Sequence, residues 1–386
     1  MENPKIRFKG FTKDWEQRKL GDIYGSIGNA FVGTATPYYA EHGHFYLESN
    51  NVKDGQINHN AEIFINDEFY EKQKDKWLHT GDMVMVQSGH VGHAAVIPEE
   101  LDNTAAHALI MFRNPKEEIE PYFLNYEYQT DKAKKQIENI TTGNTIKHIL
   151  ASDMQEFVVD IPKYEEQKVI ASYFCNLDNL ITLHQRKCEQ TKKLKKYMLQ
   201  KMFPRNGAKV PEIRFDGFTY DWEQRKLGDE AEEILAGGDI DKEKAVDDGV
   251  YPIYANALTN DGIVGYYDDY YRVKAPAVTV TGRGEVGRAR ARMIDFTPVV
   301  RLLAVRSNHD CYFLENAINN HKVVVESTGV PQLTVPQLSS YDICFPKDIV
   351  EEKKIGTYFN QLDRLITLHQ RQTDFYKKSN FYFISS

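Results

Sequence analysis

The chain has 386 residues, with 48 Lys plus Arg against 56 Asp plus Glu, and its formal charge of −8 excludes a histone-like or ribosomal protein whose whole surface is basic. Hydrophobic residues make up 41% and aromatic residues 12% of the chain, which is enough to build cores and excludes a globally disordered protein. Because there is no run of about 18 apolar residues, no signal-peptide-like start and no CxxC pair, we expect a cytoplasmic, reduced protein with no membrane association and no Cys-based zinc site.

A segment near the start of the chain recurs 207 residues later. Residues 4–22, PKIRFKGFTKDWEQRKLGD, and residues 211–229, PEIRFDGFTYDWEQRKLGD, are identical at 16 of 19 positions. A second segment, YFCNLDNLITLHQR at 173–186, recurs at an offset of 185 as YFNQLDRLITLHQR at 358–371. Two repeated segments in the same order indicate a tandem duplication in which each repeat encloses a variable region.

The first variable region, residues 23–160, matches the second, residues 230–344, only at a few short segments. Both contain short β-like runs between Gly-, Asn- and Asp-containing turns, followed by a helical stretch. Val91-Gly92 aligns with Val286-Gly287. Each region is therefore predicted to fold as a compact α+β domain. Their divergence predicts two related binding surfaces of different specificity, and the alternative is a duplicated fold whose loops drifted without a functional change.

A long helix is predicted after the first variable region. Residues 165–203 contain neither Pro nor Gly, and their apolar residues are spaced three and four apart, which is typical of an amphipathic helix. About 38 residues would span about 57 Å. The second repeat predicts the same helix from about Val350, interrupted in its first turns by Gly356. Each apolar stripe needs a partner, and antiparallel pairing of the two helices would relate the halves by a pseudo-two-fold.

The second variable region contains the most basic stretch of the chain. Between Arg272 and Arg306 there are eight Arg or Lys against two acidic residues, a local balance of +6. Arg288, Arg290 and Arg292 alternate, so on a strand they share one face. Such arginines suit phosphate contacts and guanine readout, and a solvated charged strand is the alternative.

Motifs for catalysis or cofactor binding are weak or missing. Gly282-Arg-Gly-Glu-Val-Gly287 matches GxGxxG, but the following RARARMIDF favours a β-hairpin over the helix that a dinucleotide site requires. His42-x-His44 and His90-x-x-His93 have no third ligand at a convincing spacing. Neither GxSxG nor a P-loop occurs.

The repeated W-E-x-x-K-L-G-D segment, the GDMVMVQSG segment, the exit at 143–162 and the EEQKVIASYFCNLDNLI helix resemble the specificity (S) subunits of type I restriction–modification systems. The resemblance covers essentially the whole chain. It implies an α+β fold with two target-recognition domains separated by two long antiparallel helices that form a coiled-coil spacer. It also implies four segments: a first recognition domain at 1–162, a spacer helix at 163–207, a second recognition domain at 208–346 and a second spacer helix at 347–386.

The resemblance further implies a non-catalytic subunit that binds double-stranded DNA at a bipartite, asymmetric, gapped site. Its partners would be two modification (methyltransferase) subunits and, through the complex, the restriction subunits. S-adenosylmethionine, ATP and Mg are expected only on those partners, so this chain itself is expected to hold no cofactor and no metal.

The candidate residues fall into two sets. The predicted DNA contacts are Ser88, His90, His93, Asn144, Thr145, Lys147, His148, Arg283, Arg288, Arg290, Arg292, Gln332 and Thr334. The predicted helix and partner contacts are Leu177, Leu180, Ile181, Leu183, Leu362, Leu365, Ile366 and Leu368.

Two points stay open at this level. The main alternative is a stand-alone duplicated module that binds nucleic acid or protein without enzyme partners, and an unrecognised nuclease or methyltransferase ranks last. The second helix ends in FYFISS, where the first continues with KKLKKYMLQKMF, so a shortened second helix and weaker pairing are expected.

Overall fold

The computed structural model describes residues 4–143, 147–205, 207–257, 259–322 and 331–384, with side chains up to residue 380. Contacts divide the chain into two units. Unit 1 comprises Met1–Leu183 and Gln372–Ser386, and unit 2 comprises His184–Arg371. Each long helix therefore contributes to both units, whereas the four-segment division remains a prediction.

Unit 1 is built on a four-stranded antiparallel sheet in the order β2-β11-β8-β9. Its strands are β2 (Tyr24–Asn29), β11 (Leu109–Pro115), β8 (Met83–Val86) and β9 (Ala94–Val96). The smaller sheets are β1 (Glu16–Lys19) with β12 (Val158–Ile161), β5 (Val52–Lys53) with β6 (Gln56–Ile57), and β10 (Ala105–Ala106), β4 (His44–Leu47), β7 (Phe64–Ile65) and β3 (Tyr39–Ala40). Its short helices are α1 (Leu20–Ile23), α2 (Asp67–Glu71), α3 (Pro121–Glu127), α4 (Asp131–Ile140) and α5 (Ala151–Gln155).

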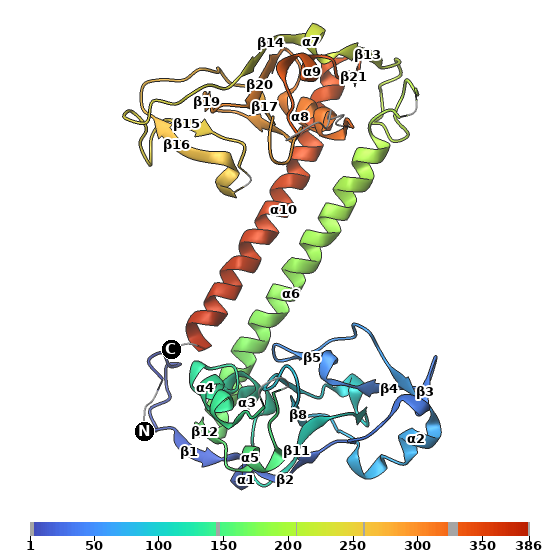
Figure 1. Cartoon of the computed structure of the whole chain (residues 1–386), viewed down its shortest axis with the longest axis vertical. Helices are drawn as coiled ribbons and strands as arrows, with labels where there is room; N and C mark the ends of the chain where they lie inside the picture. Colours follow the sequence, from blue (N-terminus) through green and yellow to red (C-terminus); the bar gives the residue numbers. More distant parts are fainter. Residues whose placement is uncertain (1–3, 144–146, 206, 258, 323–330, 385–386) are drawn as a thin grey trace. The chain divides into compact units, whose positions relative to one another are not determined.

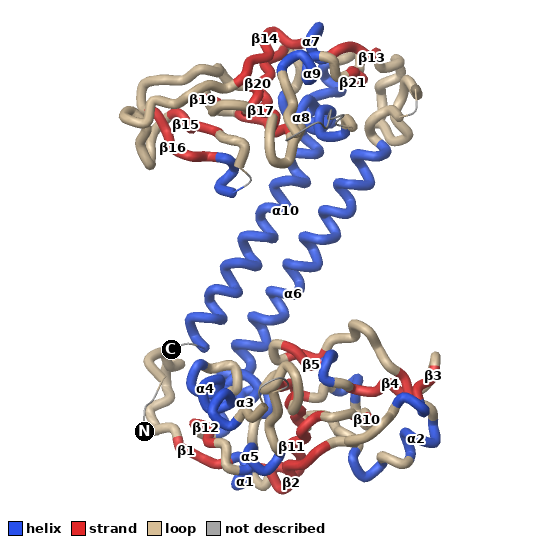
Figure 2. The backbone as a smooth tube through the Cα atoms, in the orientation of Figure 1, coloured by secondary structure: helices blue, strands red, loops and turns tan. Residues whose placement is uncertain are grey.

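Unit 2 repeats this plan with a sheet in the order β14-β20-β17-β18, whose strands are among those drawn in red in Figure 2. The strands are β14 (Ala231–Ala236), β20 (Leu302–Ser307), β17 (Ala277–Thr281) and β18 (Ala289–Arg292). The other strands are β13 (Glu223–Lys226) with β21 (Asp342–Phe345), and β16 (Ile263–Tyr267), β15 (Tyr251–Tyr254) and β19 (Thr297–Pro298). Its short helices are α7 (Leu227–Glu230), α8 (Cys311–Asn320) and α9 (Val335–Ser339).

The two units also bury equivalent residues. Leu20 and Leu227, which occupy the same position in the repeated segment, are fully buried. In unit 1 the leucine packs with Phe112 and Phe157, and in unit 2 with Phe313 and Phe345. The duplication seen in the sequence is therefore a duplication of sheet order and of core.

The long helices are α6 (Tyr164–Lys201) and α10 (Ile349–Ile384), of 38 and 36 residues. The second helix is thus shorter than the first by only two residues, and the weaker pairing stays a prediction. The expected interruption at Gly356 was wrong, because α10 runs through it. A Cβ at Gly356 would lie 2.0 Å from Asp310 Oδ1 and 2.9 Å from Phe313 N, so the glycine instead allows the start of α8 to approach α10 closely.

Within each unit, α6 and α10 run antiparallel (Figure 1). In unit 2, Lys195 Nζ donates to both carboxylate oxygens of Asp363 at 2.7 Å. In unit 1, Asn380 Nδ2 donates to Asp178 Oδ1 at 3.1 Å. At an offset of 185, Asn380 is equivalent to Lys195 and Asp363 to Asp178, so the same contact occurs twice with the two helices exchanging roles. The predicted α+β fold with long antiparallel helices and an internal repeat is confirmed.

A bidentate ion pair fixes each repeated N-terminal segment to the first turn of a long helix. Arg7 Nε and Nη2 donate to Glu166 at 2.6 and 2.7 Å, and Arg214 Nε and Nη2 donate to Glu351 at 2.7 and 2.9 Å. The glutamates are only 2% and 1% exposed. Each arginine also donates to a backbone carbonyl in its own segment, that of Lys13 or Tyr220. These two buried pairs, the Arg–Glu clamps, explain why both segments are preserved in the repeat.

Replacing Arg214 with Gln leaves the Glu351 carboxylate buried without its cation, so we expect unit 2 to lose about 3 kcal/mol of unfolding free energy. Arg214→Lys keeps the charge without the paired geometry and should recover part of the loss. Lys72→Gln removes an exposed pair with Glu68, which solvent screens, and should leave the stability almost unchanged. Urea denaturation of the three variants measures this, and equal losses in Arg214→Gln and Lys72→Gln would contradict the role of the clamp.

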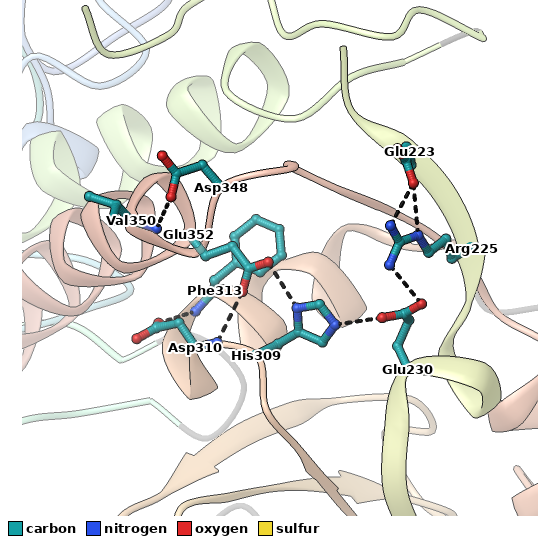
Figure 3. Close-up of polar contacts among 9 residues, drawn as sticks. All are labelled: Glu223, Arg225, Glu230, His309, Asp310, Phe313, Asp348, Val350 and Glu352. Carbon is teal, nitrogen blue, oxygen red and sulfur yellow. Dashed lines mark hydrogen bonds and ion pairs between the residues drawn. The ribbon is translucent and has the colours of Figure 1, made fainter. Parts of the chain in front are cut away.

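Unit 2 also contains a partly buried polar network around His309 (Figure 3). His309 Nδ1 lies 2.8 Å from Glu352 Oε1, and its Nε2 lies 3.0 Å from Glu230 Oε2. Arg225 donates to Glu230 at 3.0 Å. Burial lowers the pKa of His309, but its hydrogen bonds and charge interactions with the two glutamates outweigh burial, so this pKa lies above its ordinary value. Both ring nitrogens face carboxylate oxygens, which accept hydrogen bonds when ionised, so this geometry favours the imidazolium form of His309.

The raised pKa of His309 gives a stabilisation that is present below about pH 6.5 and is lost as the pH rises through the folded-state pKa. We expect His309→Gln to reduce the unfolding free energy by about 1–3 kcal/mol at pH 6, because Glu352 loses its cationic partner, and by less at pH 9. Denaturation at both pH values checks this, with the exposed His42→Gln as control. A deficit that is the same or larger at pH 9 would show that the charged form of His309 is not the stabilising one.

Candidate nucleic-acid interface

One hairpin occurs in both units and carries most of the predicted contact residues. In unit 1 it joins β8 to β9, with Val86 N donating to His93 O at 2.8 Å and Gly92 N to Val86 O at 3.1 Å. In unit 2 it joins β17 to β18, with Thr281 N donating to Arg288 O at 3.0 Å and Gly287 N to Thr281 O at 2.7 Å. The alignment of Val91-Gly92 with Val286-Gly287 is thus confirmed by the same bonding pattern.

The turn geometry explains the shared glycine. Gly92 and Gly287 have φ angles of +86° and +83°, a region that residues with a Cβ rarely adopt. The Gly282–Gly287 segment leads from strand to strand, so the hairpin interpretation is confirmed and the helix of a dinucleotide site is not formed. In this common frame His93 of unit 1 occupies the position of Arg288 in unit 2.

The unit 2 hairpin presents two of the predicted arginines to solvent. The side chains of Arg288 and Arg290 are 53% and 48% exposed. Arg288 Nη1 lies 2.8 Å from Glu285 Oε2, and Arg290 pairs with Asp261. Exposed pairs of this kind contribute about 0–1 kcal/mol, so DNA phosphates can compete for both arginines.

Arg292 shares the strand face of Arg290 but is only 7% exposed. Its Nε donates to Thr279 Oγ1 at 3.0 Å, and its Nη1 and Nη2 donate to the side chain and backbone of Asp261 at 2.6 and 3.0 Å. Burial lowers the pKa of Arg292. The structure therefore gives Arg292 a position inside the unit, while its contact with DNA remains a prediction.

Two further predicted residues lie beside the start of the same hairpin. Leu333 N donates to Gly282 O at 3.0 Å, which brings Gln332 and Thr334 next to Arg283. Thr334 Oγ1 donates to Gln337 Oε1 at 2.9 Å in a capping box at the start of α9. Thr334 thus has a structural role in addition to its predicted one.

The unit 1 hairpin gathers a different set of predicted residues. Gly89 N donates to Lys147 O at 3.1 Å, and Ser88 forms a β-bridge with His148. The side chains of His90, Lys147 and His148 are exposed. Asn144 and Thr145 lie outside the described residues, so the structure does not place them.

A cavity of about 420 Å³ adjoins this hairpin. Its lining includes His90, His93, Lys134 and Lys147. Asp54 N donates to His93 Nδ1 at 3.2 Å, and burial is the main cause that lowers the pKa of His93. A neutral imidazole here suits hydrogen bonding more than charge pairing.

Three residues that hold the unit 2 hairpin were not anticipated from sequence. Asn256 Oδ1 accepts from Gly282 N at 2.9 Å, Asp261 pairs with both Arg290 and Arg292, and the Tyr254 ring lies 3.7 Å from the Arg292 guanidinium. The sequence signal at this place is Asn260-Asp-Gly262, which indicates a turn but not its arginine partners.

The apolar residues predicted as helix and partner contacts on α6 and α10 fall into buried and exposed positions. Leu177 and Leu362 are buried, and Leu180, Ile181 and Ile366 are half-buried. Leu183, Leu365 and Leu368 are 43–49% exposed. The identical LITLHQR runs at 180–186 and 365–371 thus keep an apolar edge at the surface of both helices.

The described residues offer no metal centre and no membrane-spanning segment. Among them, no group of three or more His, Cys, Asp or Glu side chains is placed to hold an ion. None of the helices described combines the length and apolar character needed to cross a bilayer. The four cysteines are free thiols.

Comparison with known proteins agrees with this duplicated frame. A model of the type I restriction modification DNA specificity domain matches residues 12–193 and 220–374. A Mycoplasma pneumoniae protein named as a type I specificity subunit is 26% identical over 250 residues, which are 60% of this chain and 65% of the relative. A Methanocaldococcus jannaschii protein named as the type I restriction enzyme MjaX specificity subunit is 25% identical over 97% of this chain and 93% of the relative.

The fold is also that of a solved structure. The crystal structure of a type I restriction-modification S subunit from M. genitalium aligns with a TM-score of 0.70 and 14% identity, over 99% of this chain and 98% of the other. Since the family model covers most of both repeats, the chain belongs to the type I restriction modification DNA specificity domain family.

Proposed function

We propose that this chain recognises a bipartite, asymmetric, gapped site in double-stranded DNA, with each unit binding one half-site. The observation that carries the proposal is the hairpin with the same backbone bonding in both units and different side chains on it. Exposed arginines in unit 2 suit phosphate and guanine contacts, whereas serine, histidine and lysine in unit 1 offer a different set of donors. Two hairpins that share a backbone conformation but carry different side chains would recognise two different half-sites.

The chain would direct enzyme partners to that site in the cytoplasm and perform no catalysis itself. The apolar edges of the repeated LITLHQR runs support two equivalent docking surfaces for two modification subunits. These partners, and restriction subunits joined through the complex, would hold the S-adenosylmethionine, Mg and ATP. The competing account is a stand-alone binding module with no enzyme partners.

Co-expression with a modification subunit separates these two accounts. A complex on size-exclusion chromatography supports the proposal, and a chain that stays monomeric beside its partner contradicts it. Incubation of the purified chain with labelled S-adenosylmethionine and DNA should transfer no methyl group, and transfer by the chain alone would contradict a non-catalytic role.

Exchange of the first variable region, residues 23–160, for that of another family member should change one half-site and leave the other unchanged, because the two hairpins lie in separate variable regions. Methylation of a random-sequence DNA library by the reconstituted complex reads both half-sites. Exchange of residues 230–344 is the matched control and should change the opposite half. A change in both half-sites after a single exchange would contradict the two-reader model.

Insertion of one helical turn, four residues, into both α6 and α10 should lengthen the unspecified gap by about 2 bp, since a turn adds about 6 Å and a base pair about 3.4 Å. The same library assay measures the gap. A four-residue insertion in the exposed bend at residues 247–248 serves as control and should leave the gap unchanged. An unaltered gap after the helix insertions would show that these helices do not set the spacing.

A further inference from the structure

Asp261 forms ion pairs with two arginines, one exposed and one buried. It lies in the turn Thr259–Gly262, and its two carboxylate oxygens pair with Arg290 and Arg292 of β18. One negative charge thus faces two positive charges on the strand predicted to contact DNA. The consequences differ for the two arginines because one is buried and the other is not.

Arg292 holds Asp261 in place. The Arg292 guanidinium stacks on the Tyr254 ring, and its Nε donates to Thr279 Oγ1. Because this cation is only 7% exposed, a nearby carboxylate stabilises it. Asp261 and its neighbour Asn260 have φ angles of +54° and +48°. A left-handed pair of this kind persists only where surrounding contacts hold it, and Arg292 supplies them through the Asp261 side chain and carbonyl.

Arg290 is held far less firmly. Both Arg290 and Asp261 are about half exposed, so water screens their ion pair and the pair contributes little. If Arg290 leaves, Asp261 keeps Arg292 as its partner and is not left unpaired. Exchange of the Asp261 carboxylate for a phosphate oxygen therefore leaves the turn intact.

We propose that Asp261 pairs with Arg290 in the free protein and so keeps this arginine from DNA phosphates. Arg290 then contributes to binding only when the hairpin is bound in the groove of target DNA. This inference rests on the proposed function. On non-target DNA the hairpin is not held in the groove, and a phosphate must displace Asp261 without support from base contacts. Asp261 thus lowers the affinity for non-target DNA and raises the ratio of specific to non-specific binding.

Arg290→Gln tests the proposal while the Asp261–Arg292 pair is kept. The full chain is titrated, over a range of salt concentrations, with a duplex carrying the mapped target and with a duplex of the same composition in shuffled order. On the target we expect about tenfold weaker binding and a salt slope smaller by about 0.9, the value of one phosphate contact. On the shuffled duplex we expect less than a twofold change. Equal losses on both duplexes would overturn the proposal.

Asp261→Asn tests it from the other side. The substitution also takes the carboxylate from the buried Arg292, but the Asn amide oxygen and the backbone carbonyl at this position can still accept its hydrogen bonds. Releasing Arg290 should tighten binding of the shuffled duplex several-fold and steepen its salt slope. Asp269→Asn, which removes the same charge from an exposed position in unit 2, is the matched control. Tightening no greater than in this control would overturn the proposal. A wild-type chain that does not distinguish target from shuffled DNA would contradict the proposed function itself, whereas the two variant results bear on the Asp261–Arg290 pair.

Discussion

The bidentate ion pair between a repeated arginine and the first turn of a long helix is the interaction on which the rest of the architecture depends. Arg7 with Glu166 and Arg214 with Glu351 join segments that are 159 and 137 residues apart, and both glutamates are almost completely buried. A buried carboxylate without its cation is strongly destabilising. Each clamp therefore ties the start of a repeat to its long helix, and the variable region between them can change without altering the frame.

The variable regions of the two units differ in the side chains that they place at equivalent positions. Where unit 2 places the charged network of His309, Glu230 and Glu352, unit 1 has Ile119, Ile23 and Gln167. In unit 1 the Glu120 amide donates to Gln167 Oε1 at 3.0 Å, in the way that the Asp310 amide donates to Glu352 in unit 2. The backbone contact is thus preserved while the charge is not. The hairpins follow the same rule, with one bonding pattern and two sets of side chains.

The periodic features of the fold could be predicted from sequence. The apolar spacing and the absence of Pro and Gly indicated the first long helix to within about two residues at each end. The charge alternation after Gly287 indicated a strand, and β18 is that strand. The predicted helix interruption at Gly356 was wrong because it relied on the weak helix propensity of glycine alone. The role of this glycine depends on its close contact with Asp310, a residue 46 positions earlier.

The candidate interface could be predicted less completely. The arginines were found because they alternate along one strand, but alternation does not show which of them is buried. Arg292 is buried because Tyr254, Asp261 and Thr279 surround it, and these three come from other strands and turns. Such contacts form only when the sheet is assembled, so they have no periodic signature in the chain.

The central claim is that one duplicated frame carries two different DNA readers. Mapping of methylated bases across the genome of the native host, before and after deletion of this chain, tests it most directly. The account predicts that deletion abolishes methylation at one asymmetric motif made of two specified halves and an unspecified gap. A continuous or palindromic motif, or a methylation pattern that does not change on deletion, would contradict it.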